Sequence, residues 1–280
     1  MQRLGLIAGA GDLPELIVQQ TYQAGHNLPT VALSTEIANR LTPYCPILAQ
    51  YGPGQLNKII RTLQQHTVRQ VVIIGKIPKR LLFGIARLDR RAIRLLRRVP
   101  NYQDVTLLHA LIDEFAREGL EVVEQTRLLG HLITPPGILG SRQPTKRQWE
   151  DIRFGFAQAK KLASMDIGQT VVVRRQTVLA VEAGEGTDAT IQRGCQLGGR
   201  GAIVVKASRP YQDRRFDIPT VGPKTLQGLI DTGAAVLAVE AGTTLMLHRP
   251  QLVAAANAHR TILLGVPAMS LHPTKRGKES

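Results

Sequence analysis

The chain carries two hydrophobic patterns that alternate along its length. Short apolar runs bounded by glycine or polar residues indicate buried strands, whereas longer stretches with apolar residues at helical spacing indicate helices. In the first half, these patterns predict helices at 15–24, 55–65 and 104–118 and strands at 4–8, 31–33, 70–74 and 121–129. Strands that alternate with helices are typical of a parallel sheet with helices on both faces.

The second half of the chain shows more strands than helices. A tight turn at Arg175–Gln176 joins two of the strands as a hairpin, so the second sheet is predicted to be mixed. The patterns predict a helix at 149–164 and strands at 170–174, 178–182, 202–206, 235–239, 244–247 and 261–264.

The stretch 131–147, between these halves, is rich in Pro, Gly and Thr and lacks sustained periodicity, which is typical of a linker. A length of 280 residues also suits two domains. We therefore predict an α/β protein with two domains. These are a Rossmann-like N-terminal domain with a parallel sheet over 1–130, a linker over 131–148, and a C-terminal α/β domain with a mixed sheet over 149–280.

The charge balance points to an anionic partner, because 36 Lys and Arg residues face 21 Asp and Glu residues and give a formal charge of +15. Nucleic acid, a nucleotide and an acidic membrane surface all fit this charge. Aromatic residues make up only 4% of the chain and no known nucleic-acid motif is present, so no nucleic-acid partner is expected.

Apolar runs such as 71–74 are too short to cross a bilayer, and residues 1–10 lack the pattern of a signal peptide. We expect a cytoplasmic protein. The two cysteines, Cys45 and Cys195, have neither metal-site spacing nor the density of a disulfide scaffold, so they are interpreted as packing residues.

One segment concentrates positive charge, with apolar residues at helical spacing between the basic ones. This pattern predicts a basic amphipathic helix. Such a helix either lies on anionic lipid or packs its apolar face on the core and leaves its arginines in water, and both readings stay open. Its basic residues are Lys79, Arg80, Arg87, Arg90, Arg91, Arg94, Arg97 and Arg98.

The first predicted strand runs into a glycine turn that contains Gly9 and Gly11, and a helix follows, as in nucleotide-binding folds. Pro14 stands where the dinucleotide fingerprint has its third glycine, which argues against NAD or FAD. Strand 70–74 ends at Gly75 and Lys76, at the sheet edge where open α/β folds bind ligands. A solvated lysine at a strand end is the alternative reading of Lys76.

Three carboxylates follow another strand within seven residues: Glu182, Glu185 and Asp188. The glycines between them permit positive φ values, and Thr187 is a candidate N-cap for the next helix. A phosphate or a hydrated metal would fit this loop, although an acidic surface turn is the alternative. The first seven residues of the run 178–188 recur at 236–242, which suggests a second strand that ends in a glutamate near the same cleft.

Asp217 lies between apolar neighbours, just before the turn at Ile218 and Pro219. Rigid placement of this kind suits metal coordination or the orientation of an attacking water, while binding of backbone N–H groups in the turn is the alternative. Gln169 could donate to a phosphate. The basic residues that could neutralise phosphate charge, or else stay solvated, are Lys206, Arg209, Arg214 and Arg215. With no Walker, GxSxG or zinc pattern, the residues favour phosphoryl or pyrophosphate chemistry.

Several motifs occur together and in order, and with them the chain resembles the LpxI family of UDP-2,3-diacylglucosamine pyrophosphatases over nearly its full length. The arginine-rich stretch after Lys76 departs from the family pattern. The motifs that carry the resemblance are Leu4–Pro14, Gly75–Lys76, Asp104, Asp166–Gln169, Val178–Asp188, Arg215–Gly222 and Val239–Gly242.

The resemblance implies a magnesium-dependent hydrolase of lipid A biosynthesis that splits UDP-2,3-diacylglucosamine into UMP and lipid X, with the lipid product held between a Rossmann-like domain and a C-terminal catalytic domain. The family's essential aspartate falls on Asp217, with Glu182 and Asp188 as further catalytic candidates. Asp217 and Glu185 are the candidate metal ligands. The candidate substrate-binding residues are Gly9, Gly11, Leu13, Pro14, Gly75, Lys76, Asp104, Gln169, Thr187 and Lys206.

A UDP-linked acylated sugar is anionic at one end and membrane-bound at the other. The resemblance therefore implies peripheral attachment to the anionic inner leaflet through the basic segment, and it leaves a homodimer open. Two alternatives remain: a noncatalytic protein that binds a nucleotide sugar or a lipid, and a hydrolase of another UDP-sugar.

Overall fold

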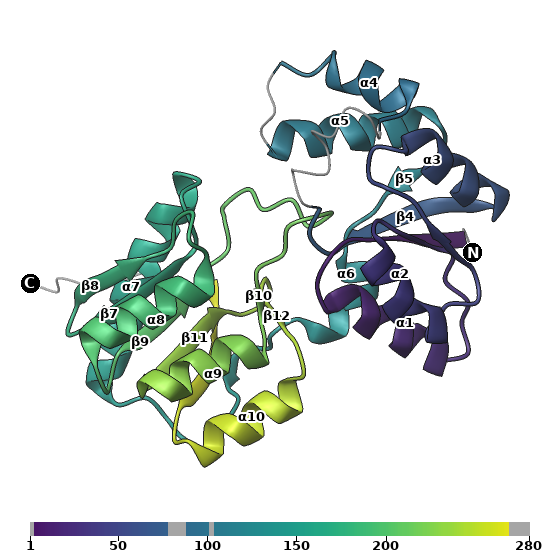
Figure 1. The fold of residues 1–280 in the computed structure, drawn as a ribbon. Helices are drawn as coiled ribbons and strands as arrows, with labels where there is room; N and C mark the ends of the chain where they lie inside the picture. Colours follow the sequence, from purple (N-terminus) through teal and green to yellow (C-terminus); the bar gives the residue numbers. More distant parts are fainter. Residues whose placement is uncertain (1–2, 78–87, 101–103, 269–280) are drawn as a thin grey trace, which may run out of the picture. The chain divides into compact units, whose positions relative to one another are not determined.

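The computed structural model describes residues 3–77, 88–100 and 104–268 (Figure 1). The chain folds into two compact units. Unit 1 comprises Met1–Leu129 and Arg214–Phe216, and unit 2 comprises Gly130–Asp213 and Asp217–Ser280. A short segment from the second half of the chain, 214–216, thus belongs to the first unit.

The described residues of unit 1 form a five-stranded sheet in the order β3-β2-β1-β4-β5. All its strand pairs are parallel, which confirms the predicted parallel sheet. The strands are β1 (Arg3–Ala8), β2 (Thr30–Ala32), β3 (Leu48–Gln50), β4 (Val68–Ile74) and β5 (Glu121–Val122).

The strand predicted at 121–129 is wrong beyond its first two residues, and β3 was not predicted. The chain leaves the sheet at Gln125, whose side chain donates a hydrogen bond to the carbonyl oxygen of Ile73 (2.6 Å) and whose backbone N–H donates to Arg214 (2.9 Å). A helical turn, α6 (Thr126–Leu129), follows.

Helices cover both faces of this sheet (Figure 1). Because side chains alternate along a strand, Ile7 faces one side and Leu6 the other. Ile7 joins a core cluster with α3, α4 and α5, while α1 and α2 bury their own apolar residues. The helices are α1 (Leu13–Gln23), α2 (Thr35–Leu41), α3 (Leu56–Gln65), α4 (Arg90–Leu96) and α5 (Asp104–Arg117), with a short 3₁₀ turn at Thr42–Tyr44.

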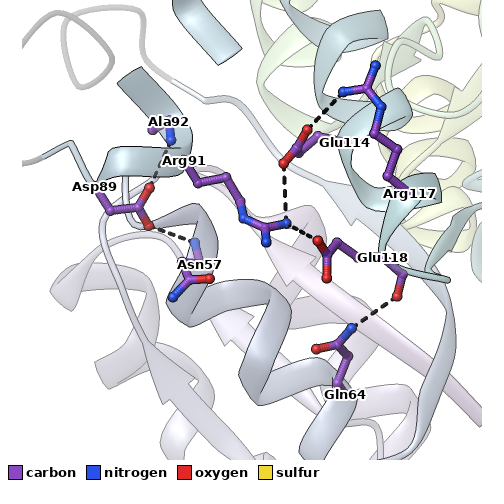
Figure 2. Close-up of polar contacts among 8 residues, drawn as sticks. All are labelled: Asn57, Gln64, Asp89, Arg91, Ala92, Glu114, Arg117 and Glu118. Atoms are coloured by element: carbon purple, nitrogen blue, oxygen red, sulfur yellow. Dashed lines mark hydrogen bonds and ion pairs between the residues drawn. The ribbon is translucent and has the colours of Figure 1, made fainter. Parts of the chain in front are cut away.

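Helix α4 is the described part of the predicted basic helix, and it is anchored to unit 1 by polar contacts (Figure 2). Asp89 caps it, because one carboxylate oxygen accepts from the Ala92 N–H (2.8 Å) and the other accepts from the Asn57 N–H (2.6 Å). Arg91 lies 3.2 Å from the Glu114 carboxylate and 2.5 Å from that of Glu118.

The apolar side of this segment packs on the core through Ala92, Leu88 and Leu95. The described part therefore supports the core-packing reading for one side of the helix, while four arginines on it stay exposed to solvent. Lys79, Arg80 and Arg87 lie outside the described residues. The exposed arginines are Arg90, Arg94, Arg97 and Arg98.

We expect Arg91→Ala to lower the free energy of unfolding of unit 1 by about 1–2 kcal/mol, because it leaves two half-buried carboxylates, Glu114 on α5 and Glu118 just after it, without their shared cation. Arg94→Ala, on the same helix but exposed, is the matched control and should change it by less than about 0.5 kcal/mol. Urea denaturation measures both. Equal effects of the two substitutions would contradict an anchoring role for Arg91.

The described residues of unit 2 form a six-stranded mixed sheet in the order β6-β13-β11-β9-β7-β8. Strands β9, β11 and β13 are parallel, and β7 is antiparallel to both of its neighbours, which confirms the predicted mixed sheet. The strands are β6 (Gly137–Ile138), β7 (Thr170–Arg174), β8 (Thr177–Val181), β9 (Ile203–Lys206), β11 (Val236–Glu240) and β13 (Ile262–Val266).

The predicted hairpin is confirmed. Arg175 and Gln176 both have positive φ (50° and 55°), the backbone of a tight hairpin turn. The buried Asp151 carboxylate holds this strained turn by accepting from both of their N–H groups, at 2.9 and 2.7 Å. The predicted strand at 244–247 lies outside the large sheet, as β12 (Leu245–Met246), which pairs with β10 (Thr220–Val221).

The segment predicted as a linker, 131–148, is built into unit 2. It includes a 3₁₀ turn at Gly130–Leu132 and strand β6, which pairs antiparallel with β13. It also contains the capping box at Thr145 that starts α7 (Lys146–Ser164). Two-residue strands carry too little periodicity to be recognised in a sequence, which explains the difference.

Helix α7 covers one face of the second sheet, and three helices cover the other. Cys195, on one of these three helices, is buried in the core cluster between them and the sheet, and Cys45 is buried in unit 1, both as free thiols, as expected of packing residues. Over the described residues, none of the helices combines the length and apolar character needed to span a bilayer. The three helices are α8 (Thr187–Gly198), α9 (Pro223–Thr232) and α10 (Arg249–Ala258).

Candidate functional site

Four segments of unit 2 bring polar residues to one edge of its sheet. Strands β8, β9 and β11 run in the same direction, so Glu182, Lys206 and Glu240 lie where these strands end. Strand β7 runs the opposite way and begins at the same edge, where Thr170 is paired with Lys206 and is preceded by Gln169. The topology therefore gathers residues that are far apart in the sequence.

Glu182 and Lys206 form the centre of this edge, and both are buried. The Thr187 hydroxyl links them: it donates to the Glu182 carboxylate (2.6 Å) and accepts from the Lys206 ammonium (2.9 Å). The backbone N–H of Gln169 donates to the second carboxylate oxygen (3.3 Å). Three predicted site residues thus surround Glu182 and hold it in place.

Burial by itself would raise the pKa of Glu182, but the charge of Lys206 and the hydrogen bonds from Thr187 and the Gln169 N–H lower it below the ordinary value of 4.5. A carboxylate whose pKa is depressed by folding stabilises the protein above its unfolded pKa, and this stability is lost as the pH falls through the folded pKa. Glu182 is therefore ionised at neutral pH, and its ionised form stabilises the folded protein.

We expect the free energy of unfolding of the wild-type protein to fall more steeply below pH 4.5 than that of Glu182→Gln, because the variant has no carboxylate to protonate at this position. Urea denaturation between about pH 3 and pH 7 measures the difference. Asp231→Asn, which alters an exposed carboxylate of the same unit, is the control and should keep the wild-type dependence. Parallel curves for wild type and Glu182→Gln would contradict this account.

Asp217 follows a loop that leaves β9 at Lys206. Its carboxylate receives hydrogen bonds from the Arg209 guanidinium (2.5 Å) and the Gln212 amide (2.6 Å). The same guanidinium lies 3.0 Å from the Asp166 carboxylate, so one arginine bridges two aspartates. The side chains of Asp217 and Asp166 are 42% and 74% exposed, so both carboxylates are accessible to a ligand.

The other acidic candidates have different partners. Glu185 pairs with Arg193 (2.7 Å), and the pKa of Glu185 is lowered by its own backbone N–H and by that arginine. Asp188 pairs with the exposed Lys224 on α9 (3.0 Å). Neither residue shares one of these partners with Asp217. Glu182, Glu185 and Asp188, although neighbours in the sequence, each have separate partners in the structure.

The prediction that Thr187 is an N-cap is wrong. Gly186, with φ of 83°, occupies the cap position, and Thr187 is the first residue of α8. The hydroxyl that a cap would use is instead occupied by Glu182 and Lys206. The Thr187 side chain therefore binds residues at the sheet edge and does not cap the helix.

In unit 1, the predicted glycine turn and Gly75 do come together. The strand order of unit 1 reverses between β1 and β4, and loops at such a point form ligand crevices in open α/β sheets. The two loops are joined by backbone hydrogen bonds between Ala10 and Lys76 (2.8 Å in both directions). A Cβ on Gly9 would lie 2.6 Å from the Lys76 carbonyl oxygen, so the close approach requires glycine.

Three of the remaining unit 1 candidates follow this crossing directly along the chain. Gly11 is exposed and has φ of 111°, Leu13 and Pro14 begin α1, and the side chain of Lys76 is exposed. Asp104 begins α5, and its side chain lies outside the described part of the structure. Ligand binding by these residues stays a prediction.

Sequence reasoning named Arg209 among the residues that could neutralise phosphate charge, but it assigned no site role to Gln212 or Asp166. The structure joins Gln212 to Asp217 directly and Asp166 to Asp217 through Arg209. Gln212 was identifiable from the sequence, because it precedes Asp217 by five residues in the same loop. Asp166 was not, because only the fold brings the end of α7 to that loop.

The chain matches both domains of one protein family. The LpxI N-terminal domain matches residues 3–132 and the LpxI C-terminal domain matches residues 135–264, which agrees with the division into units at Leu129 and Gly130. The protein named UDP-2,3-diacylglucosamine pyrophosphatase LpxI of Caulobacter vibrioides is 32% identical over 277 residues. The alignment covers 95% of this chain and 98% of the relative.

Proposed function

Because the chain belongs to the LpxI family, we propose that it hydrolyses the pyrophosphate bond of UDP-2,3-diacylglucosamine and releases UMP and 2,3-diacylglucosamine 1-phosphate in lipid A biosynthesis. The observation that carries the proposal is the match to a pyrophosphatase of this name along 95% of the chain, including both domains. The resemblance found in the sequence motifs is confirmed by this match.

We place the chemistry at the loop that carries Asp217. An exposed carboxylate that is fixed by two donors can orient a water molecule toward a phosphorus atom. Arg209 beside it presents a guanidinium suited to the charge that develops on phosphate oxygens. Lys206 and Gln169 lie at the same sheet edge, where the fold collects these side chains.

Magnesium dependence is part of the proposal. Among the described residues, no three His, Cys, Asp or Glu side chains gather closely enough to hold an ion by themselves. Mg²⁺ is, however, commonly bound through one or two carboxylates plus substrate phosphates and water. Asp217 and Asp166 fit that requirement better than Asp217 and Glu185, since they share Arg209. A bound magnesium ion would supply charge neutralisation on the phosphates.

The test is magnesium-dependent release of UMP from UDP-2,3-diacylglucosamine by the purified protein, with UDP-N-acetylglucosamine as the non-lipid comparison. Release from the lipid substrate alone is the expected result. Release from both would favour a hydrolase of other UDP-sugars. If folded protein binds the lipid substrate and releases no UMP, the noncatalytic binding role replaces the hydrolase.

We also propose that the basic surface formed by Arg90, Arg94, Arg97 and Arg98 docks the enzyme on anionic lipid. These four side chains are exposed, whereas Arg91 is engaged by Glu114 and Glu118. Each arginine near an anionic leaflet contributes about 1 kcal/mol of attraction. Because the acyl chains hold the substrate in the membrane, an enzyme that binds the membrane surface meets its substrate there.

Liposome sedimentation tests this surface with anionic and with neutral vesicles. Replacing its four arginines by glutamine should abolish the preference for anionic vesicles. The matched control replaces four exposed basic residues of unit 2, which should keep the preference. If both variants lost the preference for anionic vesicles to the same extent, net charge alone would explain the binding, and the proposal would be contradicted. The control residues are Arg142, Lys146, Arg147 and Arg153.

A further inference from the structure

A second buried ionic cluster lies beside the loop that carries Asp217. Glu240 ends β11 and is only 3% exposed. Its two carboxylate oxygens lie 2.8 and 2.7 Å from the ammonium of Lys160, which comes from α7. Ser208 donates to Glu240 through both its backbone N–H and its hydroxyl, each at 2.7 Å.

This cluster joins three elements that are distant in the sequence. Lys160 also donates to the Ser208 carbonyl oxygen (3.1 Å), so Ser208 is held through its N–H, its hydroxyl and its carbonyl group. A buried carboxylate is tolerated when it is paired and its oxygens accept hydrogen bonds, as those of Glu240 do. The first residues after β9 are thereby fixed to β11 and α7.

Ser208 directly precedes Arg209, the residue that bridges Asp217 and Asp166. Beyond it, the loop is held by its own side chains. The Arg209 N–H donates to the Gln212 side-chain oxygen (3.0 Å), and the Gln212 amide donates to the Asp217 carboxylate (2.6 Å). The position of the Asp217 carboxylate therefore depends on where Ser208 is held.

We propose that Lys160, Glu240 and Ser208 are positioning residues that fix Arg209, and through it Asp217, for pyrophosphate hydrolysis. This inference rests on the proposed function. The cluster makes its contacts with the loop and not with the reacting groups. A displacement of a reacting group by about 1 Å can cost about 100-fold in rate, so loosening Ser208 should lower kcat rather than weaken substrate binding.

The experiment measures kcat and KM for UMP release by the full-length protein. Lys160→Met should lower kcat about 10- to 100-fold and change KM less than about threefold. Lys160→Arg retains the charge and should restore kcat to within about threefold of wild type. Lys161→Met, which alters the exposed neighbour on the same helix, is the matched control and should behave as wild type.

Since loss of one member of a buried ion pair can unfold a unit, Ser208→Ala is the second variant. It keeps the pair between Lys160 and Glu240 and removes the hydroxyl hydrogen bond, so kcat should fall about 3- to 10-fold in a folded protein. Circular dichroism melting accompanies each assay and shows which variants remain folded.

Two results with the positioning variants would overturn the proposal. One is wild-type kcat in folded Lys160→Met and Ser208→Ala. The other is a Lys160→Arg variant that stays folded and is as slow as Lys160→Met, because the charge would then not be the feature that matters. If Asp217→Ala itself keeps the wild-type rate, the role proposed for Asp217 fails and with it this inference. Failure of the positioning variants alone leaves the proposed hydrolase intact.

Discussion

Asp217→Ala is expected to lower kcat for UMP release at least about 100-fold, a typical effect of losing a catalytic acid or base. The substitution removes the carboxylate that Arg209 and Gln212 hold in place and leaves the Arg209 guanidinium available to a phosphate. Substrate affinity should therefore be retained. Steady-state kinetics and equilibrium binding of UDP-2,3-diacylglucosamine measure the two effects separately.

Asp231→Ala is the matched control for this prediction. Asp231 is an exposed aspartate of unit 2 whose carboxylate accepts from Gln227 on the same helix (2.7 Å). It should keep the wild-type rate. If Asp217→Ala lowered the affinity and left kcat unchanged, the residue would bind substrate and transition state equally and would not act in the chemical step.

Lys206→Met is expected to lower the free energy of unfolding of unit 2 by about 3–5 kcal/mol, because it leaves the buried Glu182 carboxylate without a compensating charge. The loss should shrink at acid pH, where Glu182 takes up a proton. Urea denaturation of the variant at neutral and at acid pH measures both effects. The double variant Lys206→Met with Glu182→Gln should be destabilised by less than the sum of the two single changes.

Lys224→Met gives the comparison on an exposed pair. Lys224 is 87% exposed and lies 3.0 Å from the half-exposed Asp188. Water screens such a pair, so its loss should cost less than about 1 kcal/mol. Additive effects in the double variant at Lys206 and Glu182 would show that the two buried residues do not interact and would contradict the structure of this edge.

Most elements of the fold could be predicted from the sequence, because short continuous apolar runs bounded by turn residues indicate buried strands. The predicted strands at 70–74 and 170–174 appear as β4 and β7, and the hairpin at Arg175–Gln176 was found from its short turn. Short elements such as β6 offered no periodicity, so 131–148 was interpreted as a linker.

Only part of the candidate site could be predicted from the sequence. Strand ends identified Glu182 and Lys206, because chemistry-bearing residues of α/β proteins lie where strands end. The sequence also grouped Glu185 and Asp188 with Glu182 because they are neighbours along the chain. The structure separates them, since successive residues of a loop and a helix start point in different directions and meet Arg193 and Lys224 instead.

The two α/β units, the parallel and mixed sheets, the position of Asp217 before a rigid turn, and the family all follow from the order of residues. The pairing of charges could be identified only from the folded chain: Arg91 with Glu114 and Glu118, Lys160 with Glu240, and Arg209 with Asp217 and Asp166. Hydrophobic periodicity specifies which face of an element is buried, but the partner of a polar side chain depends on how distant elements pack, and that arrangement is set by the whole chain.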